Sequence, residues 1–163
     1  MKKFATMNLA DGNGEYEDRK NHIFKEGCAY LGADKKTYGK YGNEEKYLNF
    51  LKEADYIIGY KSAKCYGRNA GKVFENIYKV LEDPIIIEDY EEFIERTGSD
   101  KISMATEDWF KTEGNYAFVW KIKLVKKIII PALTGGAGYA PIGAGQRFAY
   151  AQQGLLDLVE NLV

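Results

Sequence analysis

Apolar and polar residues alternate most regularly between positions 116 and 124. Tyr, Phe, Trp, Ile and Leu occupy the even positions of this segment, while Lys121 and Lys123 occupy odd ones. A period of two is typical of a strand that buries one face. Residues 126–130 continue the strand or begin another, and Pro131 ends it because proline has no backbone N–H to donate. The pattern therefore predicts one apolar face and one face that carries lysines.

Weaker patterns predict the remaining elements. Short apolar runs predict strands at residues 3–9, 28–33, 56–63 and 72–81. Amphipathic spacing, caps and glycine stops predict helices at residues 15–26, from Asn43 to about Ala54, after Glu88 up to Gly98, and from about Tyr150 onwards. We therefore expect an α+β protein with a mixed, mostly antiparallel curved sheet or small barrel, flanked by helices.

Length and composition favour a single domain over residues 1–163. A chain of this length buries about 70% of the surface that its unfolded form exposes, so it needs no disulfide or metal for stability. The hydrophobic content of 45% and the aromatic content of 14% argue against disorder. Because two cysteines and one histidine cannot supply a four-ligand zinc site, we expect reduced thiols, no metal and no cofactor.

The sequence shows no sign of secretion or membrane insertion. The first nine residues contain two lysines but lack the apolar core of a signal peptide. No apolar run reaches the roughly 18 residues that a membrane span needs. We therefore expect a soluble protein of the cytoplasm.

The charges of the chain are segregated although they almost cancel. The formal net charge is −1, yet residues 115–150 contain no Asp or Glu. The cations of this segment are Lys121, Lys123, Lys126, Lys127 and Arg147, and its rings are Tyr116, Phe118, Trp120, Tyr139, Phe148 and Tyr150. Cations beside rings suit an anion with flat groups, and nucleic acid, either DNA or RNA, fits that description. Because the net charge is near zero, we expect binding that is selective or weak, and sensitive to salt.

Two loops are further candidate contact segments. Residues 64–71 combine the cations Lys64 and Arg68 with the ring of Tyr66. Residues 134–145 are rich in glycine but lack the Gly-Lys-Ser/Thr of a Walker loop and do not match a dinucleotide fingerprint. We interpret this second loop as a surface loop near a binding groove, with direct phosphate contact through its amides as the alternative.

Two other classes of function compete with nucleic-acid binding. Asp34 and Lys36, with Asp11 or Asp18 upstream, resemble the acid-acid-lysine set with which many nucleases hold magnesium. This acid falls in a loop rather than in a strand, and such triplets are common in a chain with 29% charged residues. A metal-dependent nuclease or another hydrolase is therefore the first alternative. The second is a protein-interaction module that self-associates through the basic sheet and the seven acids of residues 82–95, which we otherwise interpret as a solvated face.

Several segments together resemble domains of the PUA-like superfamily, in particular EVE and YTH-type domains and the N-terminal recognition domains of modification-dependent restriction systems. The segments are residues 24–32, 50–58, 72–80 and 118–122. The first is similar to the helix, glycine, short strand and glycine that open such domains. The second is similar to their lysine, small residue, aspartate and apolar strand, and the last to a strand with a tryptophan. Ala54 and Ala33 depart from the pattern, because they stand where these domains usually have glycine and tryptophan.

The resemblance implies a small curved β-barrel without catalysis of its own. It implies recognition of a modified or flipped base in an aromatic pocket, as part of a nuclease or defence system with a fused or partner nuclease or ATPase. The predicted ring contacts are Tyr30, Tyr66, Trp109 and Trp120. The predicted phosphate contacts are Lys64, Arg68, Lys121, Lys123 and Arg147. We expect the strand at 116–124 and the loop at 64–71 to form an electropositive aromatic cleft; for Trp120, which lies on the apolar face of its strand, a role in the core is the alternative.

Overall fold

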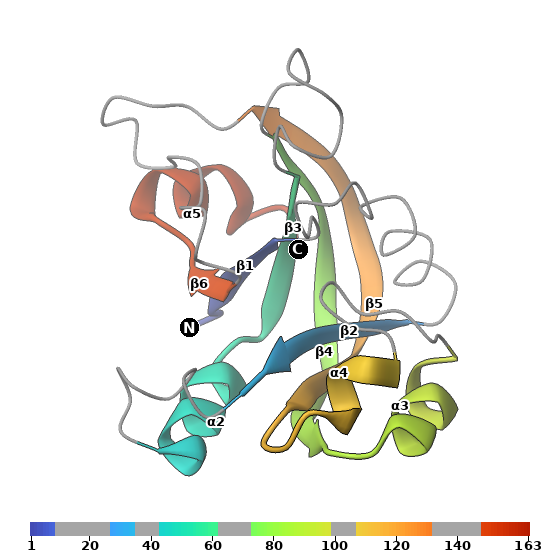
Figure 1. The fold of residues 1–163 in the computed structure, drawn as a ribbon. Helices are drawn as coiled ribbons and strands as arrows, with labels where there is room; N and C mark the ends of the chain where they lie inside the picture. Colours follow the sequence, from blue (N-terminus) through green and yellow to red (C-terminus); the bar gives the residue numbers. More distant parts are fainter. Residues whose placement is uncertain (9–26, 35–42, 62–72, 99–106, 132–147) are drawn as a thin grey trace.

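In the computed structural model, six strands of the described residues form one sheet (Figure 1). The structure describes residues 1–8, 27–34, 43–61, 73–98, 107–131 and 148–163. The strands are β1 (Phe4–Asn8), β2 (Cys28–Ala33), β3 (Tyr56–Lys61), β4 (Val73–Ile87), β5 (Tyr116–Pro131) and β6 (Phe148–Tyr150). The helices within the same residues are α2 (Glu44–Lys52), α3 (Tyr90–Thr97), α4 (Glu107–Lys111) and α5 (Gln153–Val159).

The strand order across the sheet is β2-β5-β4-β3-β1-β6. β1 and β3 run parallel, while the other neighbouring pairs in this order are antiparallel. β2 and β6 lie at the two edges, so the described strands form an open sheet rather than a closed barrel. The predicted α+β class with a mixed, mostly antiparallel sheet is confirmed.

β4 and β5 are the longest strands, and both curve along their length (Figure 1). Their pairing shifts register at several points, the first of them at Asn76, whose backbone is left-handed with a φ of 67°. A bulge adds local twist and bends the strand that contains it, which accounts for the curvature. Pro84 falls inside another shift, between Glu82 and Ile85, where a ladder hydrogen bond is not required of it.

Buried residues form three clusters on the two faces of the sheet. The α2-side cluster includes Tyr47, Leu51, Ile57, Phe118 and Trp120. The α5-side cluster includes Phe4, Ile58, Phe74, Leu155 and Val159. The α3-side cluster includes Tyr30, Ile87, Phe93, Ala117 and Val119. Because neighbouring residues of a strand point to opposite faces, the α2-side cluster lies on one face and the other two clusters lie on the opposite face.

The predicted boundaries of two helices are confirmed by their caps. Asn43 begins α2 by accepting the Lys46 N–H at 2.9 Å, and Asp89 begins α3 by accepting the Glu92 N–H at 3.0 Å. Gly98 ends α3 in a left-handed conformation with a φ of 72°. Such caps satisfy backbone groups that the helix itself leaves without partners. Local sequence is therefore enough to set where these helices start and stop.

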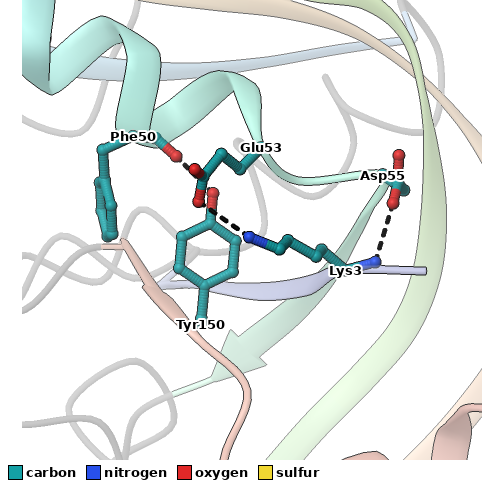
Figure 2. A network of polar contacts seen from close by, with 5 residues as sticks. All are labelled: Lys3, Phe50, Glu53, Asp55 and Tyr150. Atoms are coloured by element: carbon teal, nitrogen blue, oxygen red, sulfur yellow. Dashed lines mark hydrogen bonds and ion pairs between the residues drawn. The ribbon is translucent and has the colours of Figure 1, made fainter. Parts of the chain in front are cut away.

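Lys3 connects β1 with β3, β6 and the end of α2 (Figure 2). Its backbone N–H donates to Asp55 Oδ2 at 2.8 Å, and its carbonyl accepts the Asp55 N–H at 2.8 Å. Its ammonium group lies 3.0 Å from a Glu53 carboxylate oxygen and 5.8 Å from the ring centroid of Tyr150. The Tyr150 hydroxyl donates to the carbonyl of Phe50. One residue thus holds together segments that are far apart in sequence.

Three features of the fold differ from the sequence prediction. β4 continues past the predicted end at Leu81 as far as Ile87, because the bulges accommodate its proline. Residues 148–150 form β6 against β1, which the sequence did not predict, and the last helix begins at Gln153 rather than at about Tyr150. The short helix α4 was not predicted.

Several predicted elements lie outside the described residues. They are the helix at 15–26, most of the loop at 34–42, and the loops at 64–71 and 134–145. Within the described residues, no helix combines the length and the apolar character that crossing a membrane requires.

Candidate nucleic-acid interface

The lysines of β5 lie on the sheet face opposite the α2-side cluster. Lys121 and Lys123 are exposed, whereas Trp120 and Ile122, which alternate with them, are buried in that cluster. The predicted strand with one apolar face and one lysine-bearing face is therefore confirmed. Val119 precedes the two lysines on the same face of β5 and is buried in the α3-side cluster.

Two further lysines join them on the same face. Lys79 of β4 stands directly opposite Lys123, and Lys126 stands opposite Ile77 of the α5-side cluster. Residues directly opposite each other in an antiparallel pair share a face, with Cβ atoms about 5 Å apart. Lys79 and Lys126 are both exposed. We call Lys79, Lys121, Lys123 and Lys126 the lysine patch.

The lysine patch has no ion-pair partner in the part of the chain that the structure describes. Glu82 stands opposite Lys121 in the ladder, but its carboxylate lies 3.8 Å from the guanidinium of Arg96. The other ion pairs in these residues belong to Lys3 and Lys111. Like charges directly across a strand pair are destabilising, so the sheet carries an electrostatic cost at Lys79 and Lys123 that an anion would relieve.

Trp120, a predicted ring contact, lies inside the α2-side cluster with 1% of its surface exposed. Its ring stacks nearly parallel on Phe148, with centroids 5.9 Å apart and an interplanar angle of 10°. Its indole N–H is buried and has no hydrogen-bond partner among the described residues. Because buried donors nearly always have a partner, this group is a candidate for a ligand contact.

Tyr30 and Trp109 belong to the α3-side cluster. Tyr30 is 3% exposed and meets Phe93 edge to face at 5.4 Å. Trp109 of α4 is half-buried, and its indole N–H donates to the Tyr116 carbonyl at 3.0 Å. The side-chain amide of Asn115 donates to the backbone carbonyl of Trp109 at 3.0 Å, which connects α4 to the residue before β5. These rings support the fold, and their role as base contacts stays a prediction.

The structure brings together only some of the predicted contacts. Lys121 and Lys123 share one face, while Trp120 points to the other, so β5 cannot line a single cleft with all three. Tyr66, Lys64, Arg68 and Arg147 lie outside the described residues. Lys79 was missed by the sequence analysis, because its place beside Lys123 depends on the register of β4 against β5.

The acidic residues of 82–95 form an exposed surface, and one of them, Glu82, borders the lysine patch because it stands opposite Lys121. All seven acids of residues 82–95 are exposed, as expected for a solvated face. Three of them, Glu88, Asp89 and Glu92, line a hollow of about 830 Å³ together with Glu44 and Glu45 of α2. The negative potential of this hollow would repel phosphate. The lysine patch is therefore better suited to an anion than this hollow is.

The described residues include part of the predicted nuclease set. Asp34 follows β2 and is half-buried, while Asp11, Asp18 and Lys36 lie outside the described residues. Within the described residues, no group of three or more His, Cys, Asp and Glu side chains is placed to hold a metal ion. Cys28 is buried, and its thiol donates to the Arg96 carbonyl oxygen at 3.6 Å.

The chain has a structural likeness among solved proteins. No protein-family model matches the chain, and no curated protein matches it. Among solved structures, it is similar to the N-terminal domain of Staphylothermus marinus McrB, with 12% sequence identity and a TM-score of 0.49 over 96% of this chain and 92% of that chain. We therefore infer function from the residues of this chain alone.

Proposed function

We propose that residues 1–163 form a single nucleic-acid recognition domain without catalytic activity. The observation that carries this proposal is the pair of exposed lysines, Lys79 and Lys123, placed directly opposite each other without an anionic partner in the described residues. Such an arrangement costs stability in the free protein and is relieved when a phosphate lies between the two ammonium groups. Lys121 and Lys126 extend the same charge along β5.

The shape of the patch favours a polyanion over a small anion. Residues two apart on a strand are separated by roughly 7 Å, and neighbouring strands by about 4.8 Å. The four lysines of the patch, three on β5 and Lys79 on β4, are therefore spread along and across the strand pair rather than gathered at one point. A chain of phosphates can contact several of them in turn. Four such contacts correspond to a slope of log affinity against log salt between about −3 for a single strand and about −4 for a duplex.

Base recognition is the finer part of the proposal. The buried indole N–H of Trp120, which has no partner in the described residues, supports a role in binding a base that is modified or flipped out of its helix. A base can reach this group only if the packing around Trp120 and Phe148 opens. Tyr30, Tyr66 and Trp109 remain proposed ring contacts, and Lys64, Arg68 and Arg147 remain proposed phosphate contacts. The cellular setting that we propose is a cytoplasmic nuclease or defence system, with a fused or partner nuclease or ATPase.

Fluorescence anisotropy with labelled DNA and RNA, single- and double-stranded, tests the proposal. Replacing Lys121 and Lys123 together by Ala is expected to weaken binding to all sequences alike and to reduce the salt slope by about 2. The matched control replaces Lys46 and Lys52, two exposed lysines of α2, and should leave both quantities unchanged. If both double variants bind like the wild type, the lysine patch is not the phosphate site and the proposal is wrong.

Two measurements separate recognition from the competing functions. The first measures the affinity of the variants Trp120→Phe and Trp109→Phe for modified and unmodified oligonucleotides. A loss of preference in either variant shows that its indole determines base preference. The second incubates the protein with Mg²⁺ and end-labelled nucleic acid and separates the products on a gel. A binding domain slows the migration of nucleic acid that stays at full length, whereas a nuclease produces shorter fragments. Cleavage that is lost when Asp34 is replaced would show that the protein is a nuclease and that the proposed function is wrong.

A further inference from the structure

A hollow of about 680 Å³ opens beside the lysine patch and has no role in the function described so far. It lies between the beginning of β3, the middle of β4 and the end of α5. Its lining residues are Met1, Lys2, Asp55, Tyr56, Lys79, Val80, Glu160 and Asn161. Lys79 belongs both to this hollow and to the lysine patch, so the two surfaces are continuous.

Tyr56, Lys79 and Lys123 form one row across three strands. Tyr56 pairs with Lys79 between β3 and β4, and Lys79 pairs with Lys123 between β4 and β5. All three side chains lie on the face opposite the α2-side cluster, because their strand neighbours Ile57, Tyr78 and Ile122 belong to that cluster. Two strand spacings, about 10 Å in total, separate the backbones of Tyr56 and Lys123. This is on the order of the size of one nucleotide.

The ring of Tyr56 is held in place and partly exposed. It stacks on Phe4, with centroids 5.0 Å apart and an interplanar angle of 17°, and Phe4 is buried in the α5-side cluster. One face of the Tyr56 ring is therefore covered by the core, while the residue still lines the hollow. A fixed ring beside cations is the arrangement with which proteins bind single-stranded nucleic acid, because the base stacks on the ring and the backbone follows the cations.

Two carboxylates give the hollow a second kind of group. Asp55 is exposed and is anchored by the Lys3 N–H, which donates to its Oδ2 at 2.8 Å (Figure 2). Glu160 is exposed at the C-terminal end of α5, where a negative charge is unfavourable because the helix dipole is negative there. Carboxylates repel phosphate but accept hydrogen bonds from the exocyclic amino groups of bases, such as N4 of cytosine.

We infer that this hollow binds one nucleotide of a single-stranded segment, with its base against Tyr56, its flanking phosphates at Lys79 and Lys123, and an exocyclic amino group directed to Asp55 or Glu160. The inference rests on the proposed function and extends it. Cytosine and adenine carry such an amino group, whereas thymine and uracil do not. The hollow therefore prefers amino-bearing bases in a strand whose bases are free to unstack.

The test measures binding of short oligonucleotides of dC, dA and dT to the full chain. Wild type is expected to bind dC or dA more tightly than dT by about tenfold. Glu160→Gln is expected to reduce this preference without loss of folding, because it removes an unfavourable charge from the end of α5. Glu95→Gln, an exposed acid on α3, makes the same change of charge and should retain the preference. Tyr56→Leu should weaken single-strand binding about tenfold while duplex binding is retained.

The outcomes separate the hollow from the proposed function. If replacing Lys121 and Lys123 weakens binding but Tyr56→Leu and Glu160→Gln do not change affinity or base preference, the hollow is not a nucleotide site and the lysine patch still is. If the lysine variants also have no effect, both the hollow and the proposed function are wrong. A far-ultraviolet circular dichroism spectrum of Tyr56→Leu shows whether that variant has folded, and Glu160→Gln decides the case if it has not.

Discussion

Lys79 of β4 and Lys123 of β5 are both exposed and stand directly opposite each other across their strand pair. Cross-strand pairs of opposite charge stabilise a sheet, and pairs of like charge destabilise it. The structure thus places repulsion at a position where Glu or Thr at either residue would be more stable. Under the proposed function, a bound phosphate would relieve this cost.

The Lys79–Lys123 pair predicts opposite changes in stability and in binding. Lys123→Gln is expected to raise the free energy of unfolding by a few tenths of a kcal/mol at low salt, because the repulsion disappears. The gain should vanish in 1 M salt, where charges on the surface are screened. Urea denaturation at both salt concentrations measures this, with Lys52→Gln as the control. Lower stability of Lys123→Gln at low salt would show that the pair is not repulsive in the free protein.

The contacts of Lys3 predict that two neighbouring carboxylates differ in importance. Asp55→Ala should lower the free energy of unfolding by about 1 kcal/mol, because the Lys3 N–H loses its charged acceptor. Glu53→Ala should lower it by less than about 0.5 kcal/mol, because the ion pair between Glu53 and Lys3 is exposed. Asp55→Asn keeps an acceptor oxygen and should fall between the two. Thermal unfolding without nucleic acid compares these variants, and equal losses for Asp55→Ala and Glu53→Ala would contradict the assignment.

Asn76 predicts a dependence on backbone conformation. Its φ of 67° is strained for a residue with a Cβ, and its Oδ1 accepts the Ile128 N–H at 3.2 Å. Asn76→Gly removes the side-chain acceptor but tolerates the backbone, whereas Asn76→Ala removes the acceptor and keeps the strain. The alanine variant should therefore be less stable than the glycine variant by about 1 kcal/mol. Chemical denaturation measures the free energy of unfolding of both variants. A glycine variant less stable than the alanine variant would contradict the prediction.

Tyr78 predicts a loss of stability in alkali. Burial raises the pKa of its hydroxyl from 10.0 to about 12, the hydrogen bond with Asn76 opposes the shift, and the charge of Glu75 adds to it. Because the folded pKa is above the unfolded one, the contribution is complete below pH 10. It is lost between pH 10 and 12, up to about 3 kcal/mol, as the unfolded chain releases its proton first. Urea denaturation between pH 9 and 11.5 should show a shallower decline for Tyr78→Phe than for the wild type, and equal declines would exclude Tyr78 as the cause.

The sequence predicted elements whose signals are local. Asn43, Asp89 and Gly98 cap or stop helices through contacts within a few residues, so their pattern is sufficient. β6 is three residues long, and its partner β1 lies more than a hundred residues away, so no local pattern indicates it. Lys79 likewise joins the lysine patch only because of the register of β4 against β5, which the bulges shift.

The candidate site was predicted in part. The alternation at 116–124 correctly separates Lys121 and Lys123 from Trp120, but the same period of two places the indole and the cations on opposite faces. A single cleft on β5 that combined them was therefore inconsistent with the pattern itself. Tyr56 was not selected, because nothing in its neighbourhood in the sequence indicates the hollow that β3, β4 and α5 form around it.

The position of β1 between β3 and β6 has a consequence for how the chain reaches its native state. Thr6 donates its hydroxyl to the carbonyl of Ala149, a contact that spans 143 residues of the chain. Closing so long a loop is entropically costly and slows folding, so refolding in milliseconds to seconds is expected rather than in microseconds. Until residues 148–150 have been synthesised, one side of β1 exposes backbone groups that can pair with another chain. Because β1 has only five residues, its exposed edge is a short template for aggregation during that time.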